Sequence, residues 1–186
     1  MKSSESLFFI ALLPTVDIQN EVTEIKQYFV EKYDSRHALK SPPHVTLQPP
    51  FKWSTDKLDH LEECLVNFSQ AYSPLPITLS GFGAFPPRVI YVNVIKTPEL
   101  LTLQKELMSY LETTLNIVDQ VSKRRPFSPH MTVAFRDLTR QNFRAAWLEF
   151  EHQSLEYQFT VSQLTLLVHN GKRWNIKAEF PFELTF

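Results

Sequence analysis

Apolar residues recur at intervals of three and four positions in four stretches of the chain, and this spacing predicts four amphipathic helices. The apolar positions are Ile18, Val22, Ile25 and Phe29; Leu58, Leu61, Leu65 and Phe68; Leu100, Leu103, Leu107 and Leu111; and Phe143, Trp147 and Phe150. Residues that favour a helix start precede each stretch. They are Thr15 or Asp17, Ser54 or Thr55, Thr97 followed by Pro98, and Asp137 or Thr139.

Runs rich in β-branched and aromatic residues lie between these helices and predict strands. The runs are LFFIALL (7–13), HVTLQ (44–48), PITLSGF (76–82), RVIYVNVI (88–95), HMTVAFR (130–136), YQFTVSQLTLLV (157–168) and RWNIKAEF (173–180). Asn170-Gly171 between the last two runs indicates a β-hairpin, because these residues adopt the left-handed conformation that tight hairpin turns require. Pro86-Pro87 marks a second expected hairpin.

The order of these elements forms a loose internal repeat of strand, helix, strand and strand. It predicts an α+β protein with two similar lobes, each a mostly antiparallel sheet flanked by helices. No linker-like or low-complexity segment separates the halves. We therefore expect residues 1–186 to form a single bilobal domain.

Composition narrows the class of protein further. The 186 residues carry a net charge of −1 and are 43% apolar, which suits a folded globule without an overall attraction to polyanions. Cys64 is the only cysteine, which favours a reducing, cytoplasmic setting. The apolar run from Leu7 to Leu13 is too short to span a membrane and is expected to be a buried first strand, so no membrane association is expected.

One short pattern occurs twice. Pro43-His44-Val45-Thr46 returns 86 residues later as Pro129-His130-Met131-Thr132, each time at the start of an expected strand. Chance would give about 0.03 proline-preceded His-x-Thr triplets in a chain of this composition, so two copies indicate function. Alternate side chains of a strand share a face, which predicts that each histidine lies beside its threonine. The same alternation places Gln48 with the first pair, and Ala134 and Arg136 with the second.

These two motifs resemble those of the 2H phosphoesterases, which are defined by two His-x-Thr/Ser motifs. The chain is similar to the group of 2′-5′ RNA ligases and RNA 2′,3′-cyclic phosphodiesterases, also in its first strand and in SGFGAFPPRVIYVNV (80–94). The resemblance implies a bilobal fold in which the motifs face each other across a cleft. The basic residue after the second motif, here Arg136, lies at a slightly different offset from that of relatives.

The chemistry of such a site needs no metal or other cofactor. Two imidazoles with ordinary pKa values near 6.5 can act as base and acid on an attacking water and a departing ribose oxygen. We expect His44 and His130 to be catalytic, and Thr46 and Thr132 to donate hydrogen bonds to the phosphate. The expected activity is hydrolysis of a 2′,3′-cyclic phosphate, on an RNA end or a nucleotide, to a 2′-phosphate by a monomeric cytoplasmic protein.

Three alternatives stay open from sequence. The protein could join RNA ends through a 2′-5′ bond, or open a small cyclic nucleotide such as ADP-ribose cyclic phosphate. It could also bind RNA ends without turnover, although a binder has no need of a matched acid and base. Sequence does not decide which histidine is the acid.

Further residues are weaker candidates for substrate contacts. Arg136 and the basic run Lys123-Arg124-Arg125 could bind phosphates. Phe51, Trp53, Phe85 and Tyr91 include candidate base-stacking platforms, with burial in the core as the commoner role. The other histidines, His37, His60, His152 and His169, have no matching context and no metal-binding pattern around them.

Overall fold

Two four-stranded antiparallel sheets form the framework of the computed structural model, which describes residues 4–183. The first sheet has the strand order β2-β1-β7-β8, and its strands are Val45–Ser54, Glu5–Leu12, Gln163–His169 and Trp174–Pro181. The second sheet has the order β5-β4-β3-β6, with strands His130–Ala134, Val89–Val94, Leu75–Phe85 and Glu156–Val161. This confirms the α+β class and the two similar lobes predicted from sequence.

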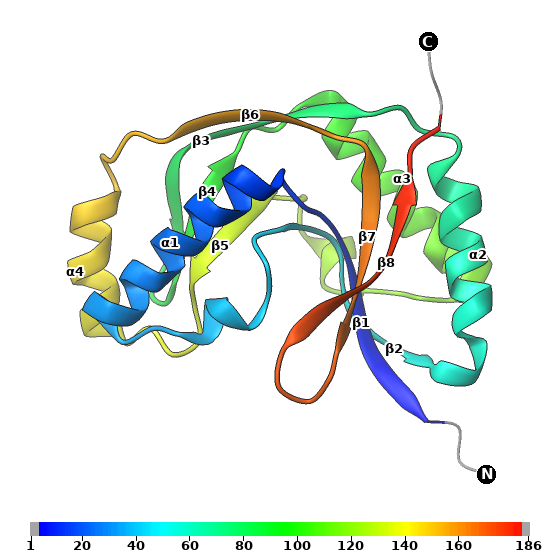
Figure 1. The fold of residues 1–186 in the computed structure, drawn as a ribbon, viewed down its shortest axis with the longest axis horizontal. Coiled ribbons are helices and arrows are strands. Elements are labelled where there is room, and N and C mark those ends of the chain that lie inside the picture. Colours follow the sequence, from blue (N-terminus) through cyan, green and yellow to red (C-terminus); the bar gives the residue numbers. More distant parts are fainter. Residues whose placement is uncertain (1–3, 184–186) are drawn as a thin grey trace.

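Helices cover both sheets. The four α-helices are α1 (Val16–Tyr33), α2 (Leu58–Ser69), α3 (Pro98–Leu115) and α4 (Arg140–Phe150), and short 3-10 helices span η1 (His37–Lys40), η2 (Thr55–Lys57) and η3 (Ser122–Arg124). Helices α2 and α3 contact the first sheet, whereas α1 contacts β5 and α4 contacts β4 of the second sheet. Figure 1 shows the two pairs of helices at opposite ends of the molecule.

The lobes do not coincide with the two halves of the sequence. Strands β1 and β2 from the first half pair with β7 and β8 from the second half, and β3 and β4 share a sheet with β5 and β6. The run YQFTVSQLTLLV is not one strand, because it divides at Ser162 into β6 of one sheet and β7 of the other (Figure 1). Each lobe is therefore assembled from both halves of the chain.

The predicted apolar faces of the helices are buried, and most of the predicted signals for their starts are correct. The Thr97 and Thr139 hydroxyls accept hydrogen bonds from the backbone amides of Leu100 and Asn142 at the starts of α3 and α4. The prediction for α2 was wrong, because Ser54 ends β2, Thr55 begins η2, and α2 starts only at Leu58. Both predicted hairpins are present, β3–β4 around Pro86-Pro87 and β7–β8 around Asn170-Gly171.

Most buried side chains belong to one apolar core that includes residues of both sheets and all four α-helices. A smaller cluster, with Phe9, Ala11 and Leu167 buried and Leu13 and Trp174 packed against it, lies apart from that core. No helix in residues 4–183 is long and apolar enough to cross a membrane.

Candidate active site

The two His-x-Thr motifs lie on equivalent strands. Strand β2 is an edge of the first sheet, β5 is an edge of the second, and the two strands contact each other. In each case the neighbouring strand, β1 or β4, pairs with the motif in antiparallel register. Residues that lie 86 positions apart in the sequence are therefore brought together where the lobes meet.

Each histidine is fixed by the same local contact. The Nδ1 atom of His44 lies 2.7 Å from the carbonyl oxygen of Pro42, and the Nδ1 atom of His130 lies 2.7 Å from that of Ser128. A carbonyl oxygen only accepts hydrogen bonds, so Nδ1 must be the protonated nitrogen of each neutral ring. The lone pair of each neutral imidazole is then on Nε2, which has no hydrogen-bond partner among residues 4–183.

Burial makes both imidazoles less basic than free histidine. It lowers the pKa of His44 from 6.5 to about 4, against the opposing effect of the hydrogen bond to Pro42, and the positive charges of Lys26 and His130 lower it further. Burial also lowers the pKa of His130, again against its hydrogen bond to Ser128. Burial therefore favours the neutral form of both imidazoles in the free protein.

The threonine hydroxyls are free to meet a ligand. Thr46 and Thr132 are half-buried, and within residues 4–183 neither hydroxyl has a hydrogen-bond partner. One residue beyond each threonine the strand contains a β-bulge, at Leu47 in β2 and at Val133 in β5. A bulge redirects the side chains that follow it. Each bulge therefore ends the alternation directly after its His-x-Thr motif.

Because of these bulges, the side chains after each threonine do not lie on the strand faces that the sequence predicted. Gln48, expected beside Thr46, is 1% exposed and directs its amide nitrogen to the Pro49 carbonyl. Ala134, expected beside Thr132, is fully buried. Strand β5 ends there, and Arg136 lies beyond it with a φ of 62°, so the argument that Arg136 shares a strand face with His130 was wrong.

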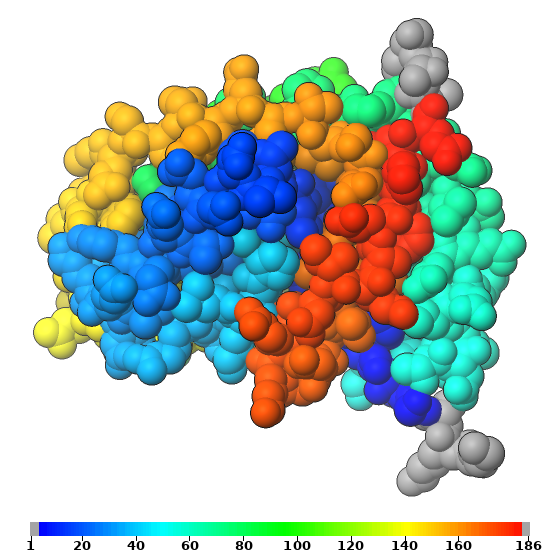
Figure 2. All heavy atoms as spheres, in the orientation of Figure 1, coloured from blue at the N-terminus to red at the C-terminus, as the bar shows by residue number. Residues whose placement is uncertain are grey.

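A cavity of about 520 Å³ lies beside the motifs. Its walls come from β1, η1, the two motif strands and the β7–β8 hairpin, and the hairpin and η1 lie side by side on the face shown in Figure 2. His44, Thr46, Thr132 and Arg136 line it. His130 is outside the lining, although its charge acts on His44. Four of the eight predicted site residues therefore share one cavity.

The aromatic candidates divide into two groups. Phe85 and Tyr91 contact the ring of His130, with centroid distances of 5.1 Å in both cases. Phe51 and Trp53 instead pack against the main core. The cavity has other aromatic walls, Phe9, Phe135 and Trp174, which sequence reasoning missed. The position of Trp174 directly after the predicted Asn-Gly hairpin was the only sequence signal that it begins a strand at this end of the sheet.

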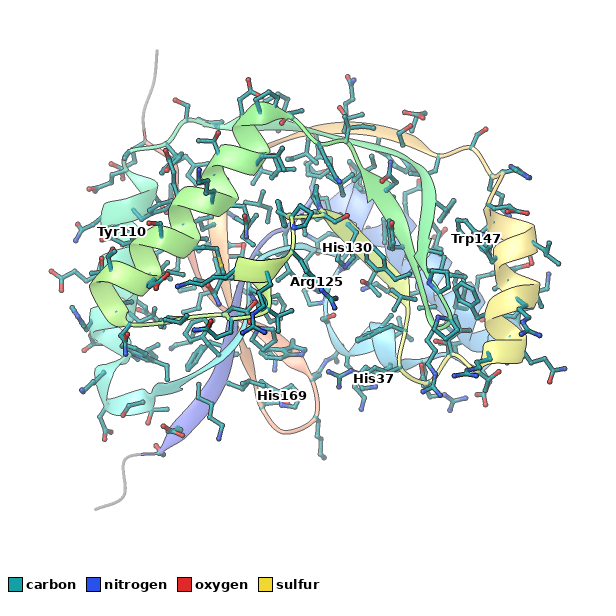
Figure 3. The ribbon with its side chains drawn as sticks, turned by 180° about the vertical axis from the view of Figure 1, so that it is seen from behind. His37, Tyr110, Arg125, His130, Trp147 and His169 are labelled. Atoms are coloured by element: carbon teal, nitrogen blue, oxygen red, sulfur yellow. The ribbon has the colours of Figure 1, made fainter. Side chains whose placement is uncertain are left out.

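The basic run before the second motif lies in and beside η3 and does not line the cavity. Lys123 forms an ion pair with Glu112 of α3, with 2.5 Å between Nζ and Oε1. Arg124 and Arg125 have no ion pair within the described part of the chain, and Figure 3 shows Arg125 between the two lobes in that view. A role for these three residues in phosphate binding stays a prediction.

Two histidines that sequence reasoning set aside do line the cavity, namely His37 of η1 and His169 at the end of β7. His60 and His152 are exposed and do not line it. Among the described residues there is no group of three or more His, Cys, Asp or Glu side chains that could hold a metal ion.

A buried lysine supports the loop before the first motif. Lys26 of α1 is 2% exposed and donates a hydrogen bond of 2.9 Å to the Ser41 carbonyl. Burial lowers the pKa of Lys26 to about 7. Sequence reasoning missed this residue, although its spacing of four residues from Val22 places it on the apolar face of the predicted helix.

Two antiparallel sheets with equivalent His-x-Thr edge strands define a bilobal protein of the 2H phosphoesterase type. The chain belongs to the 2′-5′ RNA ligase superfamily, whose family model matches residues 14–173. This confirms the resemblance that the motifs predicted.

Known relatives agree with this assignment. A Bacillus cytotoxicus protein named as a candidate phosphoesterase is 26% identical over 174 residues, which cover 92% of this chain and 94% of that protein. A Bacillus cereus protein with the same kind of name is 30% identical over 126 residues, 67% of this chain and 66% of the other. The solved structure of Escherichia coli LigT with 3′-AMP has a TM-score of 0.68 at 18% identity and covers 97% of this chain and 100% of its own. Family and fold together indicate a LigT-like phosphoesterase.

Proposed function

We propose that the protein hydrolyses 2′,3′-cyclic phosphates to 2′-phosphomonoesters without a metal, with His44 and His130 as the acid–base pair. The observation that carries the proposal is the matched pair of 2.7 Å contacts from Nδ1 to a backbone carbonyl, which leaves the two Nε2 atoms for a substrate. The proximity of β2 and β5 supports placing both imidazoles at one phosphorus atom.

In the proposed reaction, one neutral imidazole removes a proton from water, and the water oxygen forms a bond to phosphorus. The bond from phosphorus to the ribose 3′-oxygen breaks in line, and the other imidazole, protonated, gives its proton to that oxygen. The Thr46 and Thr132 hydroxyls donate to the non-bridging oxygens, where negative charge increases. In the ligation direction the histidines exchange roles.

The size of the cavity supports a nucleotide or the last residues of an RNA, because small-molecule sites commonly enclose about 300–1000 Å³. Solved structures of Escherichia coli LigT are complexes with 3′-AMP, ATP and NADP+, which supports nucleotides as ligands here too. Joining RNA through a 2′-5′ bond and opening a small cyclic nucleotide such as ADP-ribose cyclic phosphate are the related alternatives. We expect the protein to act as a monomer in the cytoplasm.

The test is a panel of 2′,3′-cyclic nucleotides and short RNAs ending in a cyclic phosphate, assayed with EDTA and with 2′- and 3′-phosphate products separated. We expect His44→Ala and His130→Ala each to lower turnover by about 10²- to 10⁴-fold. The exposed His60 and His152 serve as matched controls, whose alanine variants should keep wild-type turnover.

The outcomes separate the alternatives. Near wild-type hydrolysis by both His44→Ala and His130→Ala would remove them from catalysis. Binding of the panel without turnover by the wild-type protein would instead support an RNA-end binding module. Loss of activity with EDTA would overturn the metal-independent mechanism.

A further inference from the structure

A second group of basic side chains lies on the wall of the cavity formed by η1, the end of β5 and the β7–β8 hairpin. Its members, which we call the distal anion site, are His37, Lys40, Arg136, His169 and Lys172. Nη1 of Arg136 lies 3.4 Å from Nε2 of His37. Arg173 links the hairpin to η1 through a 3.5 Å contact from its guanidinium to the Leu39 carbonyl.

The charge of this group is not balanced by neighbouring acids. Besides burial, the positive charges of Arg136, Lys40 and His169 lower the pKa of His37, and Asp137 alone opposes them. Among the described residues no Asp or Glu lines the cavity, and neither Arg136, Lys40 nor Lys172 has an ion pair. Cations held together without a counterion favour binding of an anion.

The carboxylate of Asp137 is occupied by hydrogen bonds to the segment before η1 and to its first residue. It accepts hydrogen bonds of 2.9 Å from the Ser35 hydroxyl and from the backbone amides of Arg36 and His37. These contacts tie the start of η1 to the end of β5. Asp137 thereby positions the basic residues of both segments and has its oxygens occupied by backbone and hydroxyl donors.

Arg136 itself is held in a conformation that few residues other than glycine adopt. Its φ of 62° is in the left-handed region, and such strain is common at functional sites. The ring of Phe135 contacts both members of the pair, with the Arg136 guanidinium 5.4 Å and the His37 ring 5.0 Å from its centroid. The two side chains are therefore presented together to the cavity.

This group is separate from the His-x-Thr pair. Its members belong to η1, to the segment after β5 and to the β7–β8 hairpin, whereas the motif residues lie at the starts of β2 and β5. Figure 3 shows His130 near the middle of the molecule, and His37 and His169 toward the edge at which the hairpin ends. One cavity thus connects two differently composed sites.

We propose that the distal anion site binds a second phosphate of the substrate while the His-x-Thr motifs hold the cyclic one. The inference rests on the proposed function for the identity of the reacting group. The proposed substrates are nucleotides or RNA ends with at least one phosphate besides the cyclic phosphate. A nucleoside 2′,3′-cyclic phosphate alone would leave this part of the cavity without an anion.

The kinetic test compares three substrates at low ionic strength, because salt screens exposed charges. They are adenosine 2′,3′-cyclic phosphate, the same nucleotide with a 5′-phosphate, and a dinucleotide that ends in the cyclic phosphate. We expect wild-type kcat/KM to be at least tenfold higher for one or both substrates with a second phosphate. In Arg136→Met this preference, expressed as a ratio of kcat/KM values, should fall close to one.

Arg144 of α4 provides the matched control, because it is exposed, has no ion pair within residues 4–183 and does not line the cavity. Arg144→Met should keep the wild-type preference. Equal kcat/KM for all three substrates in the wild-type protein, or an equal loss of preference in both variants, would overturn the proposal.

A binding measurement separates this inference from the proposed function. The ring protons of His37 are followed by NMR across a pH titration with adenosine 3′-monophosphate or adenosine 3′,5′-bisphosphate. We expect the bisphosphate alone to raise the pKa of His37, because a nearby anion offsets the charges of Arg136 and Lys40. An unchanged pKa with both ligands would overturn the distal site, whereas a shift without turnover of any cyclic phosphate would contradict only the proposed reaction.

Discussion

At the scale of single residues, the candidate site depends on two backbone carbonyls. Pro42 and Ser128 each precede a motif histidine by two residues, and each accepts from its Nδ1. The prolines between them, Pro43 and Pro129, are buried and restrict the backbone where each carbonyl must face its ring. The repeated Pro-His pattern thus sets the tautomer as well as the position of each imidazole.

The lowered pKa values predict an acidic pH optimum. Hydrolysis needs one neutral and one protonated imidazole, a combination that is most populated between the two pKa values. Both are below 6.5, with that of His44 about 4. Activity should fall as pH decreases through the lower value, because the base becomes protonated, and as pH rises through the higher value, because the acid loses its proton.

A pH profile of kcat/KM for a 2′,3′-cyclic nucleotide measures this effect on the free protein. We expect a bell-shaped curve with its maximum below pH 6.5. A maximum above pH 7 would contradict the assignment of both histidines to proton transfer in the free protein.

Lys26 gives a second prediction at this scale. Its pKa is about 7 in the folded protein and about 10.5 when exposed, so the unfolded chain binds more protons between these values and stability rises with pH there. Lys26→Met lacks this effect. The free energy of unfolding of the wild type, relative to that of the variant, should therefore increase by on the order of 3 kcal/mol from pH 7 to 9.5.

Urea unfolding at the two pH values gives that difference. Lys105→Met on the exposed side of α3 is the control and should show no comparable change. A constant difference between wild type and Lys26→Met would mean that Lys26 is charged in the folded state throughout this range.

At the scale of elements, the β3–β4 hairpin supports the second motif through close packing. Gly83 pairs with Tyr91 across the hairpin, and a Cβ at position 83 would lie 2.7 Å from the Tyr91 phenol oxygen. The Tyr91 ring contacts His130. Glycine at this position therefore leaves room for the ring that contacts a candidate catalytic side chain.

Gly83→Ala should displace the Tyr91 ring and, through it, His130. We expect turnover to fall about tenfold with little change in melting temperature, because small displacements at a reacting group are costly. In a Tyr91→Ala background the same change should have almost no further effect. Equal losses in both backgrounds would show that Gly83 acts through another neighbour, and a double-mutant cycle on kcat makes the comparison.

At the scale of the whole molecule, each of the two sheets depends on both halves of the chain. Without the second half of the chain, β1–β2 and β3–β4 would be isolated two-stranded units, which are marginally stable in water. The first half also supplies α1, which contacts β5 of the second half. Folding of either lobe thus needs both halves.

We therefore expect one cooperative unfolding transition for the full chain and none for fragments 1–96 and 97–186 studied separately. Circular dichroism during thermal unfolding tests this expectation, and the mixed fragments serve as a control for recovery of structure. A cooperative transition in either fragment alone would show that half of the chain is an independent folding unit.

The sequence by itself determined most of the elements, the family and the candidate site residues. Periodicity located the four α-helices, and turn residues located both hairpins, because these signals depend on local backbone preferences. The repeated Pro-His-x-Thr pattern identified the candidate residues and the family. His44, Thr46 and Thr132 line one cavity, in agreement with the prediction that both motifs lie at strand starts beside a cleft.

Only the tertiary structure decided which strands share a sheet, where the bulges interrupt the faces, and how basic the imidazoles are. The division of one apolar run into β6 and β7, the burial of Gln48 and the lowered pKa of His44 all depend on neighbours that are distant in sequence. The same holds for the meeting of His37 with Arg136, which are 99 residues apart. Local patterns specify elements, whereas burial and electrostatic environment arise from packing between elements.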